Sequence, residues 1–205
     1  MMKTRLLFIV IILPALLISA CSKKIQEDDM KPITGDDFIQ TLLTAKPLQN
    51  KSDSMKLFGQ FVGSWEWSGY DYSGDGSKTP TKGRWIFQSV LNGMAIQDVF
   101  IFEDPRSVKN QVSYAEYGTT LRFPNSDGET WQAVWVGPMN KVVRIFEAKA
   151  IGSEIVLEGK NDKNQPIHWI FSDMTENSFR WRGEYSADNG NSWVLYEELE
   201  ARRIK

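Results

Sequence analysis

The sequence predicts an all-β fold, a single antiparallel meander barrel of about eight to ten strands with a short N-terminal helical segment. From Trp65 onward, short runs of aromatic and β-branched residues alternate with clusters of turn-forming residues at fairly even spacing. All eight tryptophans of the 205-residue chain lie between positions 65 and 193. No segment of helical pattern separates the runs, and parallel strands need such crossovers. An antiparallel meander that closes on itself also removes exposed strand edges.

The N-terminus has the pattern of a secretory signal peptide over residues 1–20. Lys3 and Arg5 precede an almost wholly apolar stretch that ends before Cys21. The segment Ile18-Ser19-Ala20-Cys21 resembles the lipobox of bacterial lipoproteins, and this resemblance implies that Cys21 carries a diacylglyceryl group. The apolar stretch is shorter than the ~20 residues that a membrane-spanning helix needs, which disfavours a transmembrane anchor.

A lipid on Cys21 would anchor the protein to a membrane without spanning it. Ser22 stands where lipoproteins retained in the inner membrane usually have Asp, so we expect the bacterial cell envelope and, within it, the outer membrane. Exposure to the periplasm or to the exterior stays open. The chain has 24 basic and 26 acidic residues, a formal net charge of -2, and therefore no global basic field for nucleic acid.

Residues 21–50 are predicted to hold the lipidated Cys, a solvated tether and a short helix. The tether is charged and poor in apolar residues. Residues 36–46 then place four apolar side chains at helical spacing and end before Pro47. A second short helix is expected after Ser52 or Asp53, just inside the predicted barrel domain of residues 51–205.

Ten runs carry the strand pattern. They lie near residues 64–72, 83–91, 94–103, 117–123, 130–136, 142–150, 154–159, 166–172, 178–185 and 192–203. Turn-forming clusters, such as those at residues 91–93, 125–128, 161–164 and 188–191, favour antiparallel hairpins between them. Bulky side chains alternate with polar ones along several runs, but the sequence leaves open which set faces the barrel interior.

The counts of one Cys and one His exclude an internal disulfide and a zinc site built from Cys and His. No nucleophile and base stand out as a pair, so no catalytic residue is assigned and the sequence does not favour an enzyme. No metal site and no cofactor are predicted. The segment Ser186-Ala187-Asp188-Asn189-Gly190-Asn191-Ser192-Trp193 has the pattern of an Asp-box, which we interpret as a stable hairpin with the Trp packed beneath it.

Gly63-Ser64-Trp65 resembles the G-x-W motif that opens the first strand of lipocalins and other calycins. Further segments, at residues 96–99, 117–122, 155–159, 171–174 and 178–184, together with this motif resemble an uncharacterised bacterial family of unknown function with a calycin (lipocalin-like) fold. The resemblance implies that Gly63 and Trp65 close one end of the barrel and that an Arg of the last strand packs on the Trp ring. Arg202 and Arg203 both suit that role, and we assign it to Arg202.

Calycin barrels usually bind small hydrophobic molecules, and this resemblance sets the functional hypothesis. We expect a membrane-anchored envelope lipoprotein whose barrel binds a small hydrophobic or amphipathic ligand. Aromatic rings would supply contact area and basic side chains would orient a polar head group. The candidate ligand-binding residues are Trp67, Trp85, Trp135, Arg144, His168, Arg180 and Arg182. The alternative is a packed barrel without a ligand that serves as a structural or protein-interaction module.

Overall fold

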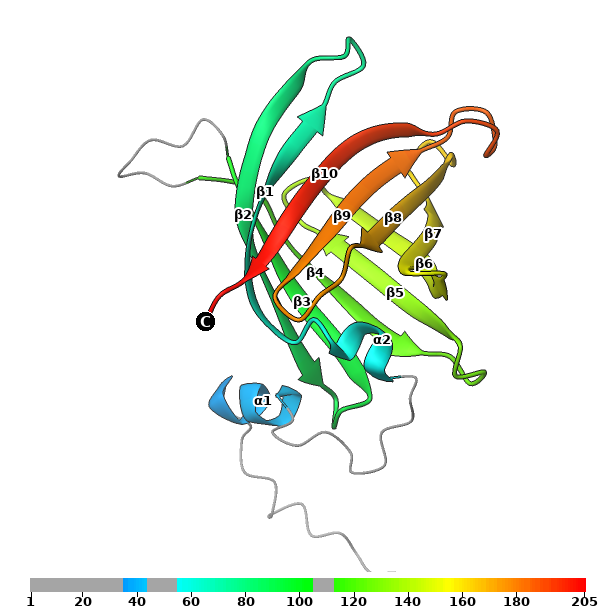
Figure 1. The fold of residues 1–205 in the computed structure, drawn as a ribbon. Helices are drawn as coiled ribbons and strands as arrows, with labels where there is room; N and C mark the ends of the chain where they lie inside the picture. Colours follow the sequence, from blue (N-terminus) through cyan, green and yellow to red (C-terminus); the bar gives the residue numbers. More distant parts are fainter. Residues whose placement is uncertain (1–34, 44–54, 105–112) are drawn as a thin grey trace, which may run out of the picture. The chain divides into compact units, whose positions relative to one another are not determined.

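A computed structural model describes residues 35–43, 55–104 and 113–205. The predicted signal peptide, Cys21 and most of the tether lie outside the described residues. The described residues form two helices and then ten strands (Figure 1): α1 Gly35–Leu42, α2 Lys56–Gly59, β1 Gly63–Tyr72, β2 Lys78–Val90, β3 Ala95–Glu103, β4 Tyr114–Pro124, β5 Thr130–Gly137, β6 Val142–Ile151, β7 Glu154–Lys160, β8 Pro166–Ser172, β9 Ser178–Tyr185 and β10 Val194–Arg203.

Each strand pairs antiparallel with the next one in the chain, and β10 pairs with β1 to close the barrel. This arrangement confirms the predicted all-β meander barrel. The turns carry the expected residues: Asn92, Asn164 and Asn189 have positive φ angles of 58°, 61° and 56°, a conformation that Asn tolerates better than most residues. α1 begins one residue before its predicted start at residue 36, and residues 44–46 of that predicted helix lie outside the described residues. β2 begins five residues before its predicted start at residue 83.

The apolar side chains of the alternating runs point into the barrel and the polar ones point outward. On β9, Phe179 and Trp181 are buried, whereas Arg180 is exposed. On β8, Ile167 and Phe171 are buried in the same way. The direction left open by the sequence is thus settled, because the apolar set gains most from removal from water.

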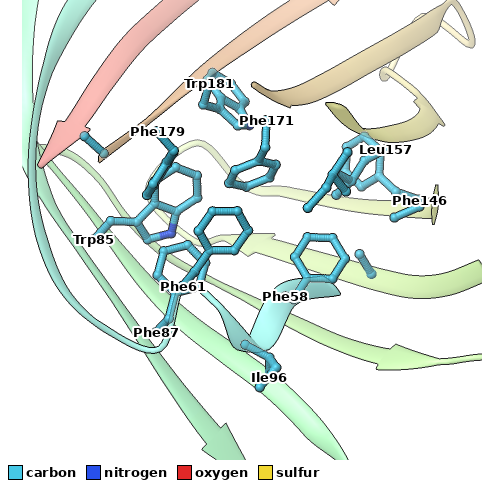
Figure 2. Close-up of a cluster of buried hydrophobic side chains, with 14 of the residues drawn as sticks. Phe58, Phe61, Trp85, Phe87, Ile96, Phe146, Leu157, Phe171, Phe179 and Trp181 are labelled. Atoms are coloured by element: carbon cyan, nitrogen blue, oxygen red, sulfur yellow. The ribbon is translucent and has the colours of Figure 1, made fainter. Parts of the chain in front are cut away.

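One end of the barrel interior is filled by a cluster of aromatic rings (Figure 2). Phe58 of α2 and Phe61, just after it, are both at most 2% exposed. The Phe58 ring lies 5.0 Å from the ring of Trp131, and the Phe61 ring lies 4.9 Å from that of Phe171. α2 therefore lies near the predicted position of the second helix, and its apolar side chain Phe58 packs inside the barrel rather than on its surface.

The same end holds a buried ion pair between Asp98 of β3 and Arg122 of β4, with Arg122 Nη1 donating to Asp98 Oδ2. Both side chains are at most 1% exposed. The other carboxylate oxygen, Asp98 Oδ1, accepts the backbone N–H of Thr120 at 3.0 Å. The guanidinium also lies over the ring of Phe58, 5.2 Å from its centroid. The pair joins two neighbouring strands from within the core. Each charge needs its partner there, because an isolated charge is not tolerated in the core.

Trp65 is fully buried and its Nε1 donates to the carbonyl of Phe61 at 2.7 Å. Arg203, not the predicted Arg202, packs across its ring, with Cζ 4.1 Å from the ring centroid. The correction follows from strand alternation: Leu199 and Ala201 point inward, so Arg203 does too, whereas Arg202 points outward and pairs with Glu200 at 2.6 Å.

Arg203 also donates to three backbone carbonyls, those of Val62, Gln60 and Glu176, at 2.7, 2.9 and 2.7 Å. These carbonyls belong to the segment before β1 and to the β8–β9 connection, so one guanidinium links three parts of the chain. Gly63 makes the approach possible, because a Cβ at this position would lie 2.5 Å from Arg203 Nη1 and its φ of 131° disfavours any side chain.

We predict that Arg203→Met lowers the free energy of unfolding by about 2–4 kcal/mol, because it removes three charge-assisted hydrogen bonds and the contact with Trp65. The matched change Arg202→Met, on the outer face of the same strand, should cost less than about 0.5 kcal/mol. Urea denaturation followed by tryptophan fluorescence measures both. Equal losses in the two variants would show that Arg203 does not hold the end of the barrel.

Candidate functional site

The other end of the barrel contains a cavity of about 580 Å³. Its lining is mainly aromatic, with polar side chains from the strand ends: Asp71, Tyr72, Trp85, Phe100, Phe102, Glu116, Thr120, Trp135, Asn140, Val142, Arg144, Asn161, Ile167, Trp169, Trp181, Tyr185, Tyr196 and Glu197. The volume falls within the ~300–1,000 Å³ that is usual for small-molecule sites. The interior of the barrel is therefore packed at one end and hollow at the other.

Three of the predicted ligand-binding residues line this cavity: Trp85, Trp135 and Arg144. Trp67 is buried beside it, with its ring stacked on that of Phe100 at 4.9 Å and an angle of 8°. It supports a cavity wall and is not itself part of the lining. The cavity thus brings together two of the three predicted tryptophans and one of the predicted basic residues.

His168, Arg180 and Arg182 lie on the outer face of the barrel and do not reach the cavity. Arg182 pairs with Glu154 at 2.8 Å, and Arg180 lies 3.7 Å from Asp173. Their neighbours on the same strands point inward, so alternation sends these polar side chains outward. The structure therefore does not place these three side chains at the cavity inside the barrel, and a role for them in ligand binding stays a prediction.

His168, on β8, instead packs against the β9–β10 hairpin that the Asp-box pattern predicts. Its ring stacks on Trp193 with centroids 3.6 Å apart, and its Nδ1 lies 3.1 Å from Glu184 Oε1. Asp188 accepts hydrogen bonds from the backbone N–H and the hydroxyl of Ser192, at 2.8 and 2.7 Å, which holds the pKa of this carboxyl down at about 2. The segment is a stable turn, as expected from its sequence.

The floor of the cavity carries polar atoms without a partner among the described residues. They are Trp85 Nε1, Trp181 Nε1 and Thr120 Oγ1. The three side chains are 5%, 6% and 1% exposed. A buried donor without a partner costs about 1–3 kcal/mol. A ligand with a hydrogen-bond acceptor would satisfy such groups.

The rim of the cavity is polar, and the sequence analysis missed most of it. Glu116 accepts from the backbone N–H groups of Tyr117 and Met139, at 2.9 and 3.3 Å, and from Asn140 Nδ2 at 2.6 Å. These bonds tie the β5–β6 turn to β4. Arg144 lies 3.7 Å from Asp162, and its side chain is 21% exposed.

A β-bulge between Leu195 and Glu197 turns the start of β10 inward. Tyr196 therefore reaches the cavity, where its hydroxyl accepts Trp169 Nε1 at 2.6 Å. Gly183 leaves room for this ring, because a Cβ there would lie 2.5 Å from Tyr196 Cζ. Burial, and next the nearby Glu197, raise the pKa of Tyr196 above its usual range, so its hydroxyl stays neutral at physiological pH.

Glu197 and Asp71 face each other across the β1–β10 pair and both line the cavity. Glu197 Oε1 is buried and has no hydrogen-bond partner among the described residues. Burial, and next the negative charge of Asp71, raise the pKa of Glu197 to about 8. Burial also raises the pKa of Asp71. Because side chains alternate along a strand, the apolar Trp65 and Trp67 place Asp71 inward on β1. Ala201 places Glu197 inward on β10 in the same way, so the sequence could have indicated both cavity residues.

Among the described residues, no group of three or more His, Cys, Asp or Glu side chains is arranged to hold a metal ion. Within the same part of the chain, no helix has the length and apolar character needed to cross a membrane.

No family model matches the chain, and no curated protein matches it. Solved structures do: an S-type phycobiliprotein lyase, CPES, from Guillardia theta superposes with a TM-score of 0.53 at 11% identity, covering 73% of this chain and 92% of the lyase chain. Rv2717c from M. tuberculosis superposes with a TM-score of 0.56 at 10% identity, covering 76% of this chain and all of the other.

These likenesses concern the fold, and with the ten-strand barrel they support the calycin-like architecture. The relation to an uncharacterised bacterial family stays a prediction.

We predict that Glu197→Gln changes how stability depends on pH. A carboxyl whose pKa is about 4.5 unfolded and about 8 folded keeps its proton longer in the folded state, so stability falls as pH rises through this interval. Glutamine does not titrate. The variant should therefore be more stable than the wild type above pH 8, by about 1–3 kcal/mol after allowance for solvent in the cavity.

Denaturation curves measured across this pH interval test the prediction. Glu200→Gln, on the outer face of β10, is the matched control and should follow the wild-type profile. Parallel profiles for wild type and Glu197→Gln would contradict the assigned environment of Glu197.

Proposed function

We propose that the protein is a membrane-anchored lipoprotein of the bacterial cell envelope whose barrel binds a small, mostly hydrophobic ligand. The observation that carries the binding proposal is the cavity of about 580 Å³ with its aromatic lining. Rings such as those of Trp85, Trp135 and Trp169 offer large apolar contact areas, and burial of a ligand against them is favourable. The likeness to a phycobiliprotein lyase supports a binding role for a barrel of this kind.

The polar atoms of the floor argue against the alternative of a packed structural module. A barrel with no ligand would fill this volume with its own side chains, as the end around Phe58 and Phe61 does. Here Trp85 and Trp181, whose indole N–H groups have no partner among the described residues, line a hollow instead. We infer a ligand that places an apolar body between the rings and an acceptor near the floor.

We predict that Val142→Trp weakens ligand binding at least about tenfold, because Val142 lines the cavity and the larger ring would occupy part of it. The matched change Val143→Trp places the same ring on the outer face, where Val143 is 63% exposed, and should leave binding unchanged. The measurement is a fluorescence titration with N-phenyl-1-naphthylamine, a neutral apolar dye. Equal affinity of both variants for the dye would mean that the dye binds elsewhere, and absence of binding to the wild type would contradict the proposal.

The anchoring proposal rests on the signal peptide pattern of residues 1–20 and on the lipobox at Cys21. We predict that cells expressing the full chain incorporate labelled fatty acid into the protein and that Cys21→Ser abolishes the label, since the thiol is the site of acylation. Ser22→Ala should retain it. Membrane fractionation of the same cells tests the outer-membrane location. A wild-type protein without label would exclude the lipoprotein proposal while leaving the ligand proposal intact.

A further inference from the structure

Acidic side chains outnumber basic ones on the cavity wall. Its described lining contains three carboxylates, those of Asp71, Glu116 and Glu197, and one basic side chain, Arg144. Arg144 already faces Asp162, an acidic residue outside the cavity lining, at 3.7 Å. The acidic groups therefore exceed the basic ones at the open end, and a positive group on a ligand would be attracted to it.

The three acidic side chains differ in how many hydrogen bonds they accept. Glu116 accepts four hydrogen bonds, from Tyr117, Met139 and, twice, Asn140. The hydrogen-bonding capacity of Glu116 is therefore used by neighbouring parts of the fold. Glu197 Oε1, in contrast, is buried without a partner among the described residues. The β1–β10 register places Asp71 directly opposite it, and directly opposed residues on one face of an antiparallel pair have Cβ atoms about 4.5–5.5 Å apart.

The surroundings of this pair suit an organic cation better than a hydrated inorganic one. Tyr72, Tyr196, Tyr185 and Trp169 also line the cavity, and the faces of aromatic rings attract cations. Trp85 and Trp181 line the same hollow, and their buried N–H groups have no partner among the described residues. Both features favour a ligand that combines an apolar body with a polar end.

We propose that the ligand is an apolar molecule with a protonated amino group, and that this group binds between Asp71 and Glu197. This inference rests on the proposed function, since it names the class of ligand for the same cavity. Ammonium N–H groups donate to carboxylates in short, charge-assisted hydrogen bonds. They would supply the partner that Glu197 Oε1 lacks, while the apolar body would lie against the rings of the floor.

Three probes with one apolar body test the class of ligand. Each has a naphthalene ring on a short alkyl chain, which ends in a primary amine, a hydroxyl or a carboxylate. The titrations use the full barrel of the wild type at about pH 8.5, where Glu197, with its pKa of about 8, is largely ionised and an alkylammonium, with a pKa of about 10.4, is still protonated. The expected order of affinity is amine, then alcohol, then carboxylate, with the amine about tenfold or more ahead of the alcohol.

Glu197→Gln and Asp71→Asn then test the site. Each should remove most of the preference for the amine over the alcohol while retaining affinity for the alcohol, which reports that the variant still folds and keeps its cavity. Glu200→Gln, an exposed position on the same strand, should keep the wild-type preference.

The outcomes separate this inference from the proposed function. Binding of all three probes with equal affinity, or a preference for the carboxylate, would overturn the amine proposal and leave a hydrophobic ligand in place. An amine preference that survives in Glu197→Gln and Asp71→Asn would overturn the assignment to this carboxylate pair. A wild type that binds none of the probes would overturn both this inference and the proposed function.

Discussion

Side chains alternate between two environments along the strands of a closed barrel, and most of this structure depends on that constraint. Because β10 pairs with β1, no strand has a free edge and each position faces either the interior or the exterior. The interior must then be filled by ten inward rows of side chains. On β1 and β10 these rows run from Trp65 and Arg203 at the packed end to Asp71 and Glu197 at the hollow end.

The same inward rows of side chains form a packed core at one end of the barrel and line a cavity at the other. At one end, α2 and the turn after it insert Phe58 and Phe61, and Arg203 links the segment before β1 to the last strand. The ion pair of Asp98 and Arg122 lies in this packed region, and its carboxylate also accepts the backbone N–H of Thr120 in the cavity floor. The packed end thereby fixes the floor on which the cavity is built. At the other end no helix of the described residues is inserted, and the strand ends surround a hollow.

Much of this architecture could be predicted from sequence because it follows from local patterns. Strand number and turn positions have local signals in residue type and spacing, and the closing role of Gly63 and Trp65 was implied by the resemblance of their motif to that of calycins. Strand alternation also distinguishes residues that residue type alone does not. On β10, the inward-facing Leu199 and Ala201 place Arg203 inside and Arg202 outside. On β9, Phe179 and Trp181 place Arg180 and Arg182 outside in the same way. The chemistry of the basic side chains suits an anionic head group. Their positions in the strand alternation, however, point them away from the barrel interior.

Other parts of the site have no such local signal. The bulge before Glu197 shifts the register by one residue and brings Tyr196 into the cavity, and its position depends on pairing with β9. Likewise, Asp71 and Glu197 are 126 positions apart in the chain, and barrel closure brings them together. The size of a cavity is also a property of packing in three dimensions, which a single sequence does not reveal. The sequence therefore indicated a binding barrel but not the acidic character of its open end.

The central claim is that the cavity holds a small molecule, and the most direct measurement is mass spectrometry of the folded protein. The mature domain, with Cys21 removed, would be purified from its native cells without detergent and analysed intact and after organic extraction. We expect a bound, mostly apolar compound in near-stoichiometric amount that is lost from Val142→Trp and retained by Val143→Trp. An empty wild-type protein, together with no change in melting temperature across a panel of apolar amines, alcohols and acids, would contradict the account.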